Sequence, residues 1–352
     1  MKIRVGILDS DQIYLSRLVR YFTTYYIDKV ELSVFHDAEK FLEYIQTTRM
    51  DILLANPALV PEDLTLPKTM LMAYLSESSQ AQKVNDVKVV YKYQRAELLY
   101  RELQGLYAEL DKKTTYKETE GTGEVLFFMG AAGGVGTTTL AAACAVSLAS
   151  YGKKVLYLNL EENGVIAPFL QGEGNSTLSD VLYAVKSNRS NLVLKLESMV
   201  RKSEQGVYFY EPFFITLDAH EMTEKDLKEI MDTITRYLSY DYVIVDADAA
   251  VLWKRDLLIK YARYVFVISD GKEIANQKLQ RTLYEIALKD EHEEERTMAM
   301  LRVIYNRYTG RSRKADTAYQ EMTYGTIEEL EGRSAKKVVE EIARRPFFDR
   351  LL

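Results

Sequence analysis

The chain has 352 residues and a formal net charge of −6, with 47% hydrophobic and 11% aromatic residues. This composition excludes an intrinsically disordered chain, and the length is sufficient for two domains that each bury a core. The acidic balance argues against a surface that binds nucleic acid. The chain has no window of 18 uninterrupted apolar residues, and its charged start lacks the apolar core of a signal peptide, so we expect a cytoplasmic protein.

Short apolar strands alternate with amphipathic helices over residues 1–110. Strands are predicted at 3–8, 30–35, 51–55, 69–75 and 87–91, and helices at about 13–22, 38–46 and 95–110. This alternation implies an α/β domain with a doubly wound parallel sheet. Polar side chains that could carry chemistry follow three of the strands, namely Asp9, Ser10 and Asp11, then Asn56, then Lys92.

This stretch resembles the flavodoxin-like receiver domains of two-component signalling, in which an acidic pair, a phosphoacceptor Asp and a Lys follow strands one, three and five. Asp9 and Ser10 match the acidic pair imperfectly, with Asp11 nearby, and Lys92 matches the lysine, but Asn56 stands at the phosphoacceptor position. A neutral amide is a poor nucleophile, and an incomplete acidic pair weakens any Mg²⁺ site. The resemblance therefore implies a degenerate receiver that acts as an interaction or dimerisation surface. An unrelated flavodoxin-like domain is the alternative.

Residues 111–123 are polar and charged and end in glycines, which predicts a linker between a domain at 1–110 and a second domain at 124–352. In the second domain, strands are predicted at 125–129, 155–158, 206–210, 240–248, 264–270 and 301–306, and helices at 138–150, 177–186, 191–199 and 223–237. We therefore expect a second doubly wound parallel sheet.

The strand that ends at Met129 runs into a glycine-rich turn and then into an alanine-rich helix. Such a strand–turn–helix order cradles phosphate, because glycines let backbone N–H groups approach an anion and the helix N-terminus adds its positive dipole end. Each of these features alone has a structural explanation. However, a strand ending in Asp246 and another ending in Asn306 and Arg307 follow in the order of a P-loop nucleotide-binding domain.

The segment from Ala132 to Thr139 resembles the deviant Walker A motif of the MinD/ParA family, which reads Lys-Gly-Gly-Val-Gly-Lys-Thr-Thr. Both lysines are missing here, replaced by Ala132 and Thr137. Residues 159–161 correspond to the first switch of that family, and the strand ending at Asp246 corresponds to its Walker B motif. A degenerate receiver ahead of such a domain resembles the layout of the TadZ/CpaE proteins, which position pilus machinery at a cell pole and tend to lack the usual Walker lysine.

The resemblance implies ATP and Mg²⁺ as ligands. It assigns the nucleotide contacts to Gly133, Gly134, Val135, Gly136, Thr137, Thr138, Thr139, Asn306 and Arg307, with Asn306 reading the adenine. Thr138 would ligate Mg²⁺ directly and Asp246 through a water molecule. Glu161 is the candidate for positioning the attacking water, although its counterpart in the family is Asp.

The missing lysines affect binding and hydrolysis differently. One lost charge-assisted contact costs about 1.5–3 kcal/mol, which corresponds to roughly ten- to a hundredfold in affinity, so binding in about the micromolar range is still expected. Phosphoryl transfer depends on positive groups placed against developing negative charge, so we predict slow or undetectable turnover. Lys272 and Arg307 are the candidates to substitute for the lysines.

The C-terminal stretch 338–352 mixes basic pairs with Phe347 and Phe348. MinD relatives use such a tail as a membrane anchor, but Pro346 and several acidic residues interrupt the pattern, which favours an ordinary surface helix. The histidines are widely separated and predict no metal site, these being His36, His220 and His292.

The sequence therefore predicts a cytoplasmic homodimer, located at a cell pole, that localises or assembles a pilus or secretion machine. Mg-ATP would act as a dimerisation ligand more than as fuel. The first alternative is an active partition-type ATPase that cycles on DNA or membrane. The second is a phosphorylation-dependent response regulator, against which Asn56 argues directly.

Overall fold

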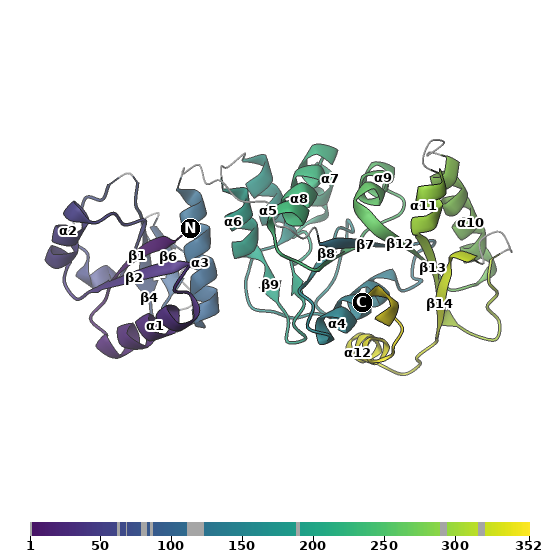
Figure 1. The fold of residues 1–352 in the computed structure, drawn as a ribbon, viewed down its shortest axis with the longest axis horizontal. Coiled ribbons are helices and arrows are strands. Elements are labelled where there is room, and N and C mark those ends of the chain that lie inside the picture. The colour runs from purple at the N-terminus through teal and green to yellow at the C-terminus, as the bar shows by residue number, and fades with distance from the viewer. Residues whose placement is uncertain are drawn as a thin grey trace. The chain divides into compact units, whose positions relative to one another are not determined.

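In the computed structural model, the described residues are 2–61, 64–67, 69–78, 83–84, 87–110, 123–187, 191–288, 294–315 and 321–352. They form two compact units (Figure 1). Unit 1 comprises Met1–Thr115 and Asn188–Met199, and unit 2 comprises Tyr116–Ser187 and Val200–Leu352. The expected linker at 111–122 and His292 lie outside the described residues.

Unit 1 contains a six-stranded sheet of order β2-β1-β3-β4-β6-β5. Its strands are β1 (Ile3–Leu8), β2 (Val30–Phe35), β3 (Ile52–Ala55), β4 (Leu71–Ser76), β5 (Lys83–Val84) and β6 (Val87–Tyr91). Its helices are α1 (Gln12–Tyr25), α2 (Ala38–Thr47), the 3₁₀ turn η1 (Pro57–Leu59), α3 (Ala96–Glu109) and α6 (Leu192–Met199). The predicted parallel order is confirmed for the five longer strands, whereas β5 pairs antiparallel with β6 and was not predicted.

Local sequence explains where the helices of unit 1 begin. The carboxylate of Asp11 accepts a hydrogen bond from the backbone N–H of Tyr14 at the start of α1, and Asp37 accepts one from Lys40 at the start of α2. Aspartate is a favoured residue at this position because it satisfies a backbone donor that has no partner within the helix.

Helix α6 corrects the expected domain division, because the sequence assigned it to the second domain and the structure places it in unit 1. It packs along α3, where the Gln104 side chain donates to Glu197 over 2.8 Å. The side chain of Asn191 donates to the Leu110 carbonyl over 2.9 Å and is fully buried. The local sequence of a short helix does not indicate the domain in which it packs, so only the tertiary contacts reveal this packing.

Unit 2 contains an eight-stranded sheet of order β14-β13-β12-β7-β11-β8-β10-β9. Its strands are β7 (Glu124–Gly130), β8 (Val155–Asn159), β9 (Arg201–Lys202), β10 (Tyr208–Phe209), β11 (Tyr242–Asp246), β12 (Ala262–Ser269), β13 (Leu301–Tyr308) and β14 (Thr323–Glu328). Neighbouring strands are parallel except for β9 and β10. The predicted α/β class, with two doubly wound sheets, is confirmed.

Helices cover both faces of this sheet (Figure 1). They are α4 (Thr137–Ser150), α5 (Leu178–Lys186), α7 (Thr216–Glu221), α8 (Glu224–Tyr237), α9 (Leu252–Tyr261), α10 (Glu273–Leu288), α11 (Glu294–Met300), α12 (Ala335–Arg344) and the 3₁₀ turn η3 (Asp349–Leu351). In Figure 1, α4 and α12 lie below the sheet, and α8, α9 and α10 lie above it.

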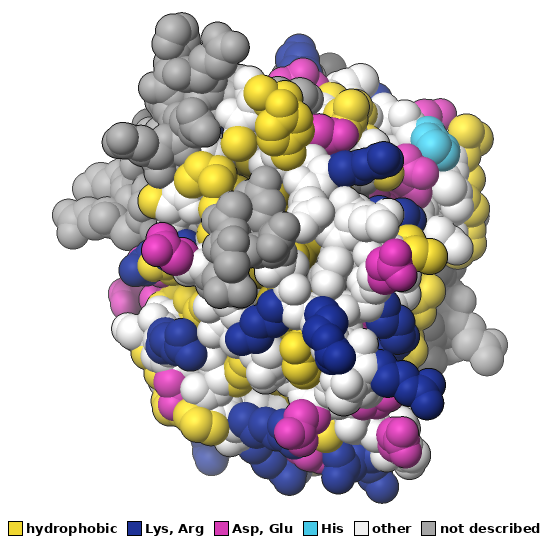
Figure 2. All heavy atoms as spheres, turned by 90° about the vertical axis from the view of Figure 1, so that its right-hand side faces the viewer, with side chains coloured by type: hydrophobic (Ala, Val, Ile, Leu, Met, Phe, Trp, Pro, Cys, Tyr) yellow, Lys and Arg dark blue, Asp and Glu magenta, His cyan; other side chains and the backbone are white. Residues whose placement is uncertain are grey.

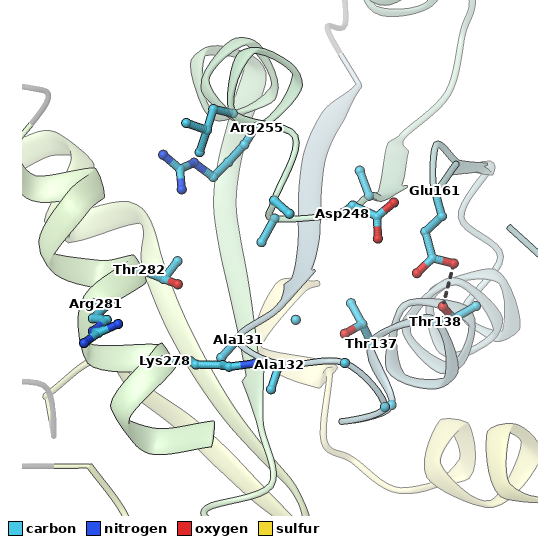
Figure 3. A pocket seen from close by; sticks show the side chains of 18 of the residues that line it. Ala131, Ala132, Thr137, Thr138, Glu161, Asp248, Arg255, Lys278, Arg281 and Thr282 are labelled. Atoms are coloured by element: carbon cyan, nitrogen blue, oxygen red, sulfur yellow. Dashed lines mark hydrogen bonds between the residues drawn. The ribbon is translucent and has the colours of Figure 1, made fainter. Parts of the chain in front are cut away.

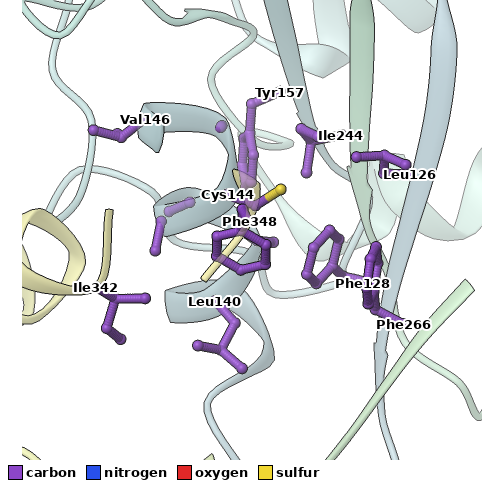
Figure 4. Packing of buried hydrophobic residues seen from close by; sticks show 14 of the residues in the cluster. Leu126, Phe128, Leu140, Cys144, Val146, Tyr157, Ile244, Phe266, Ile342 and Phe348 are labelled. Carbon is purple, nitrogen blue, oxygen red and sulfur yellow. The ribbon is translucent and has the colours of Figure 1, made fainter. Parts of the chain in front are cut away.

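The alanine-rich helix α4 lies at the centre of the core of unit 2 (Figure 4). Its residues 140–148 are all buried, because small side chains let the helix lie close to the sheet on one side and to α12 on the other. Phe128 and Phe266, which belong to the same core, stack at a centroid distance of 4.7 Å. Cys144 is fully buried here, as expected for a small core side chain.

The C-terminal stretch contributes to the same core. Helix α12 ends at Arg344, just before Pro346, and buries Val339 and Ile342 on the side that faces α4. Phe348 is fully buried and lies next to Phe128 (Figure 4). Among the described residues, no helix has the length and apolar content that crossing a membrane requires.

Candidate functional site

The glycine-rich loop joins β7, a central strand of the sheet, to the N-terminus of α4. Gly134 and Gly136 have φ angles of +74° and +89°. L-residues rarely adopt this left-handed conformation, which is why glycine is needed at both positions. The loop therefore curls back over the first turn of α4, where the backbone N–H groups have no partner within the helix.

The inner side of this loop is tightly packed, and part of its outer side is open. A Cβ atom at Gly136 would lie 2.3 Å from Nδ2 of Asn306, and one at Gly130 would lie 2.7 Å from Oγ1 of Thr137. A Cβ at Gly133 would meet no atom within 4 Å. The loop thus packs against the protein on one side and leaves space for a ligand at Gly133.

The two positions that carry lysine in the deviant Walker A motif hold short side chains. Ala132 packs against the core of unit 2, and Thr137 lies against Gly130 at the start of α4. Both residues line a cavity of about 620 Å³ outside the loop. Positive charge at this cavity must therefore come from other parts of the chain.

A buried carboxylate lies at the end of β11, next to β7. Asp246 is fully buried and accepts a hydrogen bond from the Tyr157 hydroxyl over 2.8 Å and one from the Asn159 amide over 3.4 Å. Burial raises the pKa of Asp246 to about 8, the nearby charge of Glu161 adds to this rise, and the hydrogen bonds oppose it. Its Oδ1 atom has no hydrogen-bond partner among the described residues.

Glu161 lies on the loop that follows β8. Its Oε2 atom accepts a hydrogen bond from the Thr138 hydroxyl over 3.3 Å (Figure 3). Burial and then the charge of Asp248 raise the pKa of Glu161, while hydrogen bonds from Asn159 and Thr138 lower it. The structure thus brings Thr138, Glu161 and Asp246 into one cluster of oxygen ligands.

Asn306 and Arg307 reach this loop from the end of β13. The Asn306 amide donates to the Val135 carbonyl over 2.8 Å, and Arg307 donates to the Gly134 carbonyl over 3.0 Å. Arg307 has a φ angle of +51°, which is unusual for a residue other than glycine, and it lies in β13 where the pairing with β14 shifts register. In this structure both side chains hold the shape of the loop.

The 620 Å³ cavity is lined by the loop, by acidic residues and by cations from α9 and α10 (Figure 3). The acidic side chains are Glu161, Asp248 and Glu285, and the basic ones are Arg255, Lys278, Arg281 and Arg307. Sequence reasoning identified only Arg307 among these cations. The other three lie more than a hundred positions from the loop, and a basic residue on a helix is usually a solvated one.

Lys272, the other predicted substitute for the loop lysines, does not line this cavity. Its side chain is 71% exposed and forms an ion pair with Asp270 over 3.0 Å. A second cavity, of about 340 Å³, is lined by Thr139, Asn306 and Arg307 together with residues from the end of β14 to α12. Arg307 lines both cavities.

The oxygen cluster fits Mg²⁺, which prefers hard oxygen ligands and keeps several waters. Thr138 supplies a hydroxyl at the start of α4, and Asp246 supplies a buried carboxyl oxygen that has no hydrogen-bond partner in the described part of the chain. The described residues contain no group of three His, Cys, Asp or Glu side chains that would hold a metal ion by themselves. A magnesium ion at this place therefore needs phosphate oxygens or water to complete its ligands.

Unit 1 has a second charged cluster, at the carboxyl ends of β1 and β6. The ammonium of Lys92 lies 3.0 Å from Asp9 and 3.4 Å from Asp11, and it also lies over the Tyr14 ring. Lys92 and Asp9 are almost completely buried. Burial lowers the pKa of Lys92, but the hydrogen bond and charge of Asp9 outweigh it, so the net shift is upward.

Asn56, at the phosphoacceptor position, acts as a cap. Its Oδ1 atom accepts a hydrogen bond from the Ala58 N–H over 3.1 Å at the start of η1. Asn56 and Lys92 both line a cavity of about 330 Å³. The positions of a receiver site are therefore brought together, with an amide in place of the reactive carboxylate.

Comparison with known proteins agrees with this division. The family model described as "TadZ-like, receiver domain" matches residues 1–108, and the one described as "AAA domain" matches residues 123–299, half of the chain. An uncharacterised ATP-binding protein of Methanocaldococcus jannaschii is 32% identical over 126 residues, which are 34% of this chain and 42% of that protein. The chain thus spans less than half of this relative.

A solved structure with a TM-score above 0.5 shares the fold of unit 2. A ParA family ATPase of Chlorobium tepidum has a TM-score of 0.53 at 17% identity, covering 65% of this chain and 95% of the other. A chain of the MinC:MinD cell division protein complex of Aquifex aeolicus has a TM-score of 0.45 at 20% identity, covering 63% and 94%. The chain therefore belongs to the AAA-domain family of P-loop proteins, with a TadZ-like receiver domain ahead of the P-loop domain as in the TadZ/CpaE proteins.

Proposed function

We propose that unit 2 binds ATP with Mg²⁺, and that bound nucleotide promotes dimerisation of a factor that localises or assembles a pilus or secretion machine. The observation that carries this proposal is the intact phosphate loop, with left-handed Gly134 and Gly136 and open space at Gly133. Backbone N–H groups at a helix N-terminus attract anions without any lysine. The ATP-binding relative and the TadZ-like receiver model support the nucleotide and the pilus role respectively.

The two neighbouring cavities suit the two ends of ATP. The phosphates would occupy the larger cavity, against Gly133 and Thr138, and the adenine would occupy the smaller one beside Asn306. Mg²⁺ would be held by Thr138 and, through water, by Asp246, and its charge would offset that of the phosphates. The Asn306 amide would then exchange or share its bond to Val135 with the base.

Weak hydrolysis follows from the same geometry. Lysine is absent at positions 132 and 137, and Thr137 is too short to reach across the cavity. Glu161 could orient water only as a carboxylate, and burial raises its pKa. The site therefore keeps the groups that hold a nucleotide and lacks the lysines that accelerate phosphoryl transfer in the family it resembles.

Unit 1 would provide an interaction surface in this proposal. Lys92 is held by Asp9 and Asp11, and Asn56 cannot accept a phosphoryl group as an aspartate does. We expect acetyl phosphate to leave unit 1 unlabelled. Incorporation of phosphate that Asn56→Ala abolishes would instead support a phosphorylation-dependent regulator.

The test of this proposal measures nucleotide affinity and oligomeric state on the same samples. Isothermal titration with Mg-ATP should give a dissociation constant of roughly micromolar order. Sedimentation velocity should show a monomer without nucleotide and a dimer with a non-hydrolysable ATP analogue. If the protein does not bind nucleotide at millimolar Mg-ATP, the proposed nucleotide site is wrong. If it binds nucleotide tightly but its mass in sedimentation does not change, nucleotide does not promote dimerisation.

A partition-type ATPase that binds DNA would need a continuous basic surface. The face of unit 2 seen in Figure 2 shows many Lys and Arg side chains in its lower half, with Asp and Glu side chains among them. Such mixed charge favours weak non-specific binding at most. ATP-dependent binding to DNA at physiological salt would favour this alternative over the assembly factor.

A further inference from the structure

Three cations line the phosphate cavity without belonging to the glycine-rich loop. Arg255 lies in the first turns of α9, and Lys278 and Arg281 lie on α10. Lys278 and Arg281 are three positions apart, which places them on the same face of the helix. Glu161 and Asp248 lie toward the other end of the cavity (Figure 3). The cavity thus has an acidic side next to Thr138 and a basic side on α9 and α10.

Arg255 is the most informative of the three, because its side chain is only 2% exposed. Its Nε atom lies 3.2 Å from Asp256, and its Nη1 atom lies 3.3 Å from Glu285. Its Nη2 atom is buried and has no hydrogen-bond partner among the described residues. Buried donors are nearly always paired, so Arg255 is a cavity-lining residue whose guanidinium keeps one donor without an acceptor among the described residues.

Lys278 and Arg281 are exposed and form no ion pair with the residues that the structure describes. Lys278, on α10, and Ala132, on the glycine-rich loop, both line the cavity (Figure 3). Ala132 is the first position at which the MinD/ParA motif carries lysine. Lys278 thus brings a positive charge from another helix to the cavity that Ala132 lines.

We propose that Arg255, Lys278 and Arg281 bind the terminal phosphate of a nucleoside triphosphate from within the same chain and so supply binding charge that the glycine-rich loop lacks, without the catalytic role of the loop lysines. This inference rests on the proposed nucleotide site and adds that the site selects between triphosphate and diphosphate. The loop amides would hold the phosphates common to ADP and ATP, whereas the α9–α10 cations would contact only the third phosphate. The domain would therefore distinguish triphosphate from diphosphate.

The experiment compares two ligands on the full-length chain. Affinities for ADP and for the non-hydrolysable triphosphate AMPPNP are measured by isothermal titration with Mg²⁺, for the wild type and for Lys278→Ala/Arg281→Ala. Both substituted residues are exposed, so the variant is expected to fold, which circular dichroism checks. Lys272→Ala is the matched control, because Lys272 is an exposed lysine near the start of the same helix that does not line the cavity.

The wild type should bind AMPPNP more tightly than ADP. The double variant should lose roughly ten- to a hundredfold in AMPPNP affinity and less than about threefold in ADP affinity, since only charge-assisted contacts to the third phosphate are removed. Arg255→Lys keeps the charge but removes the Nη2 donor, and it should weaken AMPPNP selectively as well.

Equal losses for the two ligands, or affinities equal to those of the control, would overturn the inference while leaving nucleotide binding intact. If the wild type binds neither ADP nor AMPPNP, the inference fails together with the proposed function. The two failures are therefore distinguishable from the wild-type titration alone.

Discussion

Unit 1 and unit 2 each hold a buried cation beside a cavity, Lys92 in the first and Arg255 in the second, but the partners of the two cations differ. Lys92 is enclosed by Asp9 and Asp11 at 3.0 and 3.4 Å, so its charge is neutralised within the domain. Arg255 has two carboxylate neighbours and still has a guanidinium nitrogen without a partner among the described residues, and Lys278, which lines the same cavity, forms no ion pair with them.

This difference indicates that the charge of Lys92 stabilises the fold, whereas the charge of Arg255 is available to a ligand. A buried cation with all its partners in place stabilises the fold that surrounds it and has little left to offer a ligand. A buried cation with a free donor is poised for an anion. Both sites have lost a reactive group of the family they resemble, at Asn56 and at Thr137, yet only the second keeps unused positive charge.

The largest expected effect concerns the buried ion pair between Lys92 and Asp9 in unit 1. Lys92→Met would leave Asp9 buried without its partner and should lower the free energy of unfolding by about 3–5 kcal/mol. Lys88→Met is the matched control, because Lys88 forms a half-exposed pair with Glu102 and should cost at most about 1 kcal/mol. Urea unfolding followed by tyrosine fluorescence measures both. Adding Asp9→Asn to Lys92→Met should restore part of the lost free energy of unfolding. If Lys92→Met and Lys88→Met lowered the free energy of unfolding equally, the buried ion pair would have no special contribution to stability.

The glycine-rich loop provides the next test. Gly136→Ala would strain the backbone and place Cβ against Asn306, so we expect a loss of about 2 kcal/mol or more in stability together with nucleotide binding. Gly133→Ala should change stability by less than about 1 kcal/mol, because its Cβ meets no atom, but it should weaken phosphate binding. Thermal unfolding measures the stability of both variants, and isothermal titration with Mg-ATP measures their nucleotide affinity. Full nucleotide affinity in Gly136→Ala would show that the loop is not the cradle.

The buried carboxylate of unit 2 should make stability depend on pH. Because the pKa of Asp246 is raised to about 8, the protonated group favours folding below about pH 4, and this contribution is lost as pH rises through 8. Without metal or nucleotide, Asp246→Asn should therefore be more stable than the wild type at pH 8.5, by on the order of 2 kcal/mol, and close to it at pH 4. Urea unfolding in EDTA at the two pH values measures this. Glu224→Gln replaces an exposed carboxyl and is the control. If the difference in free energy of unfolding between Asp246→Asn and the wild type were the same at pH 4 and pH 8.5, it would contradict a raised pKa of Asp246.

The smallest expected effect is at the former phosphoacceptor. Asn56 caps η1, and aspartate caps equally well, so Asn56→Asp should change the free energy of unfolding by only about 0.5 kcal/mol. Asn56→Ala removes the cap and should cost about 1 kcal/mol. Chemical denaturation of the two variants compares them. A large loss in Asn56→Asp would mean that the neutral amide is required by its surroundings.

The sequence alone was sufficient for most strands, although not for β5, β9 and β14, and for residues whose roles depend on local pattern. Asp246 ends an apolar strand and Gly136 ends a glycine-rich turn, so their positions could be predicted from neighbours in the chain. Arg255 and Lys278 could not, because their relation to the loop arises only when α9 and α10 pack over the sheet. Helix α6 was misassigned for the same reason, since its bond from Asn191 to Leu110 joins distant parts of the chain.

The central claim is that the cradle of unit 2 binds nucleotide without loop lysines and without appreciable turnover. Its most direct test measures Mg-ATP affinity and phosphate release on the wild type and on Ala132→Lys/Thr137→Lys. The account predicts binding of roughly micromolar order with background turnover in the wild type, and about tenfold or greater gains in both for the variant. Wild-type turnover equal to that of the lysine variant, or no wild-type binding at millimolar Mg-ATP, would contradict it.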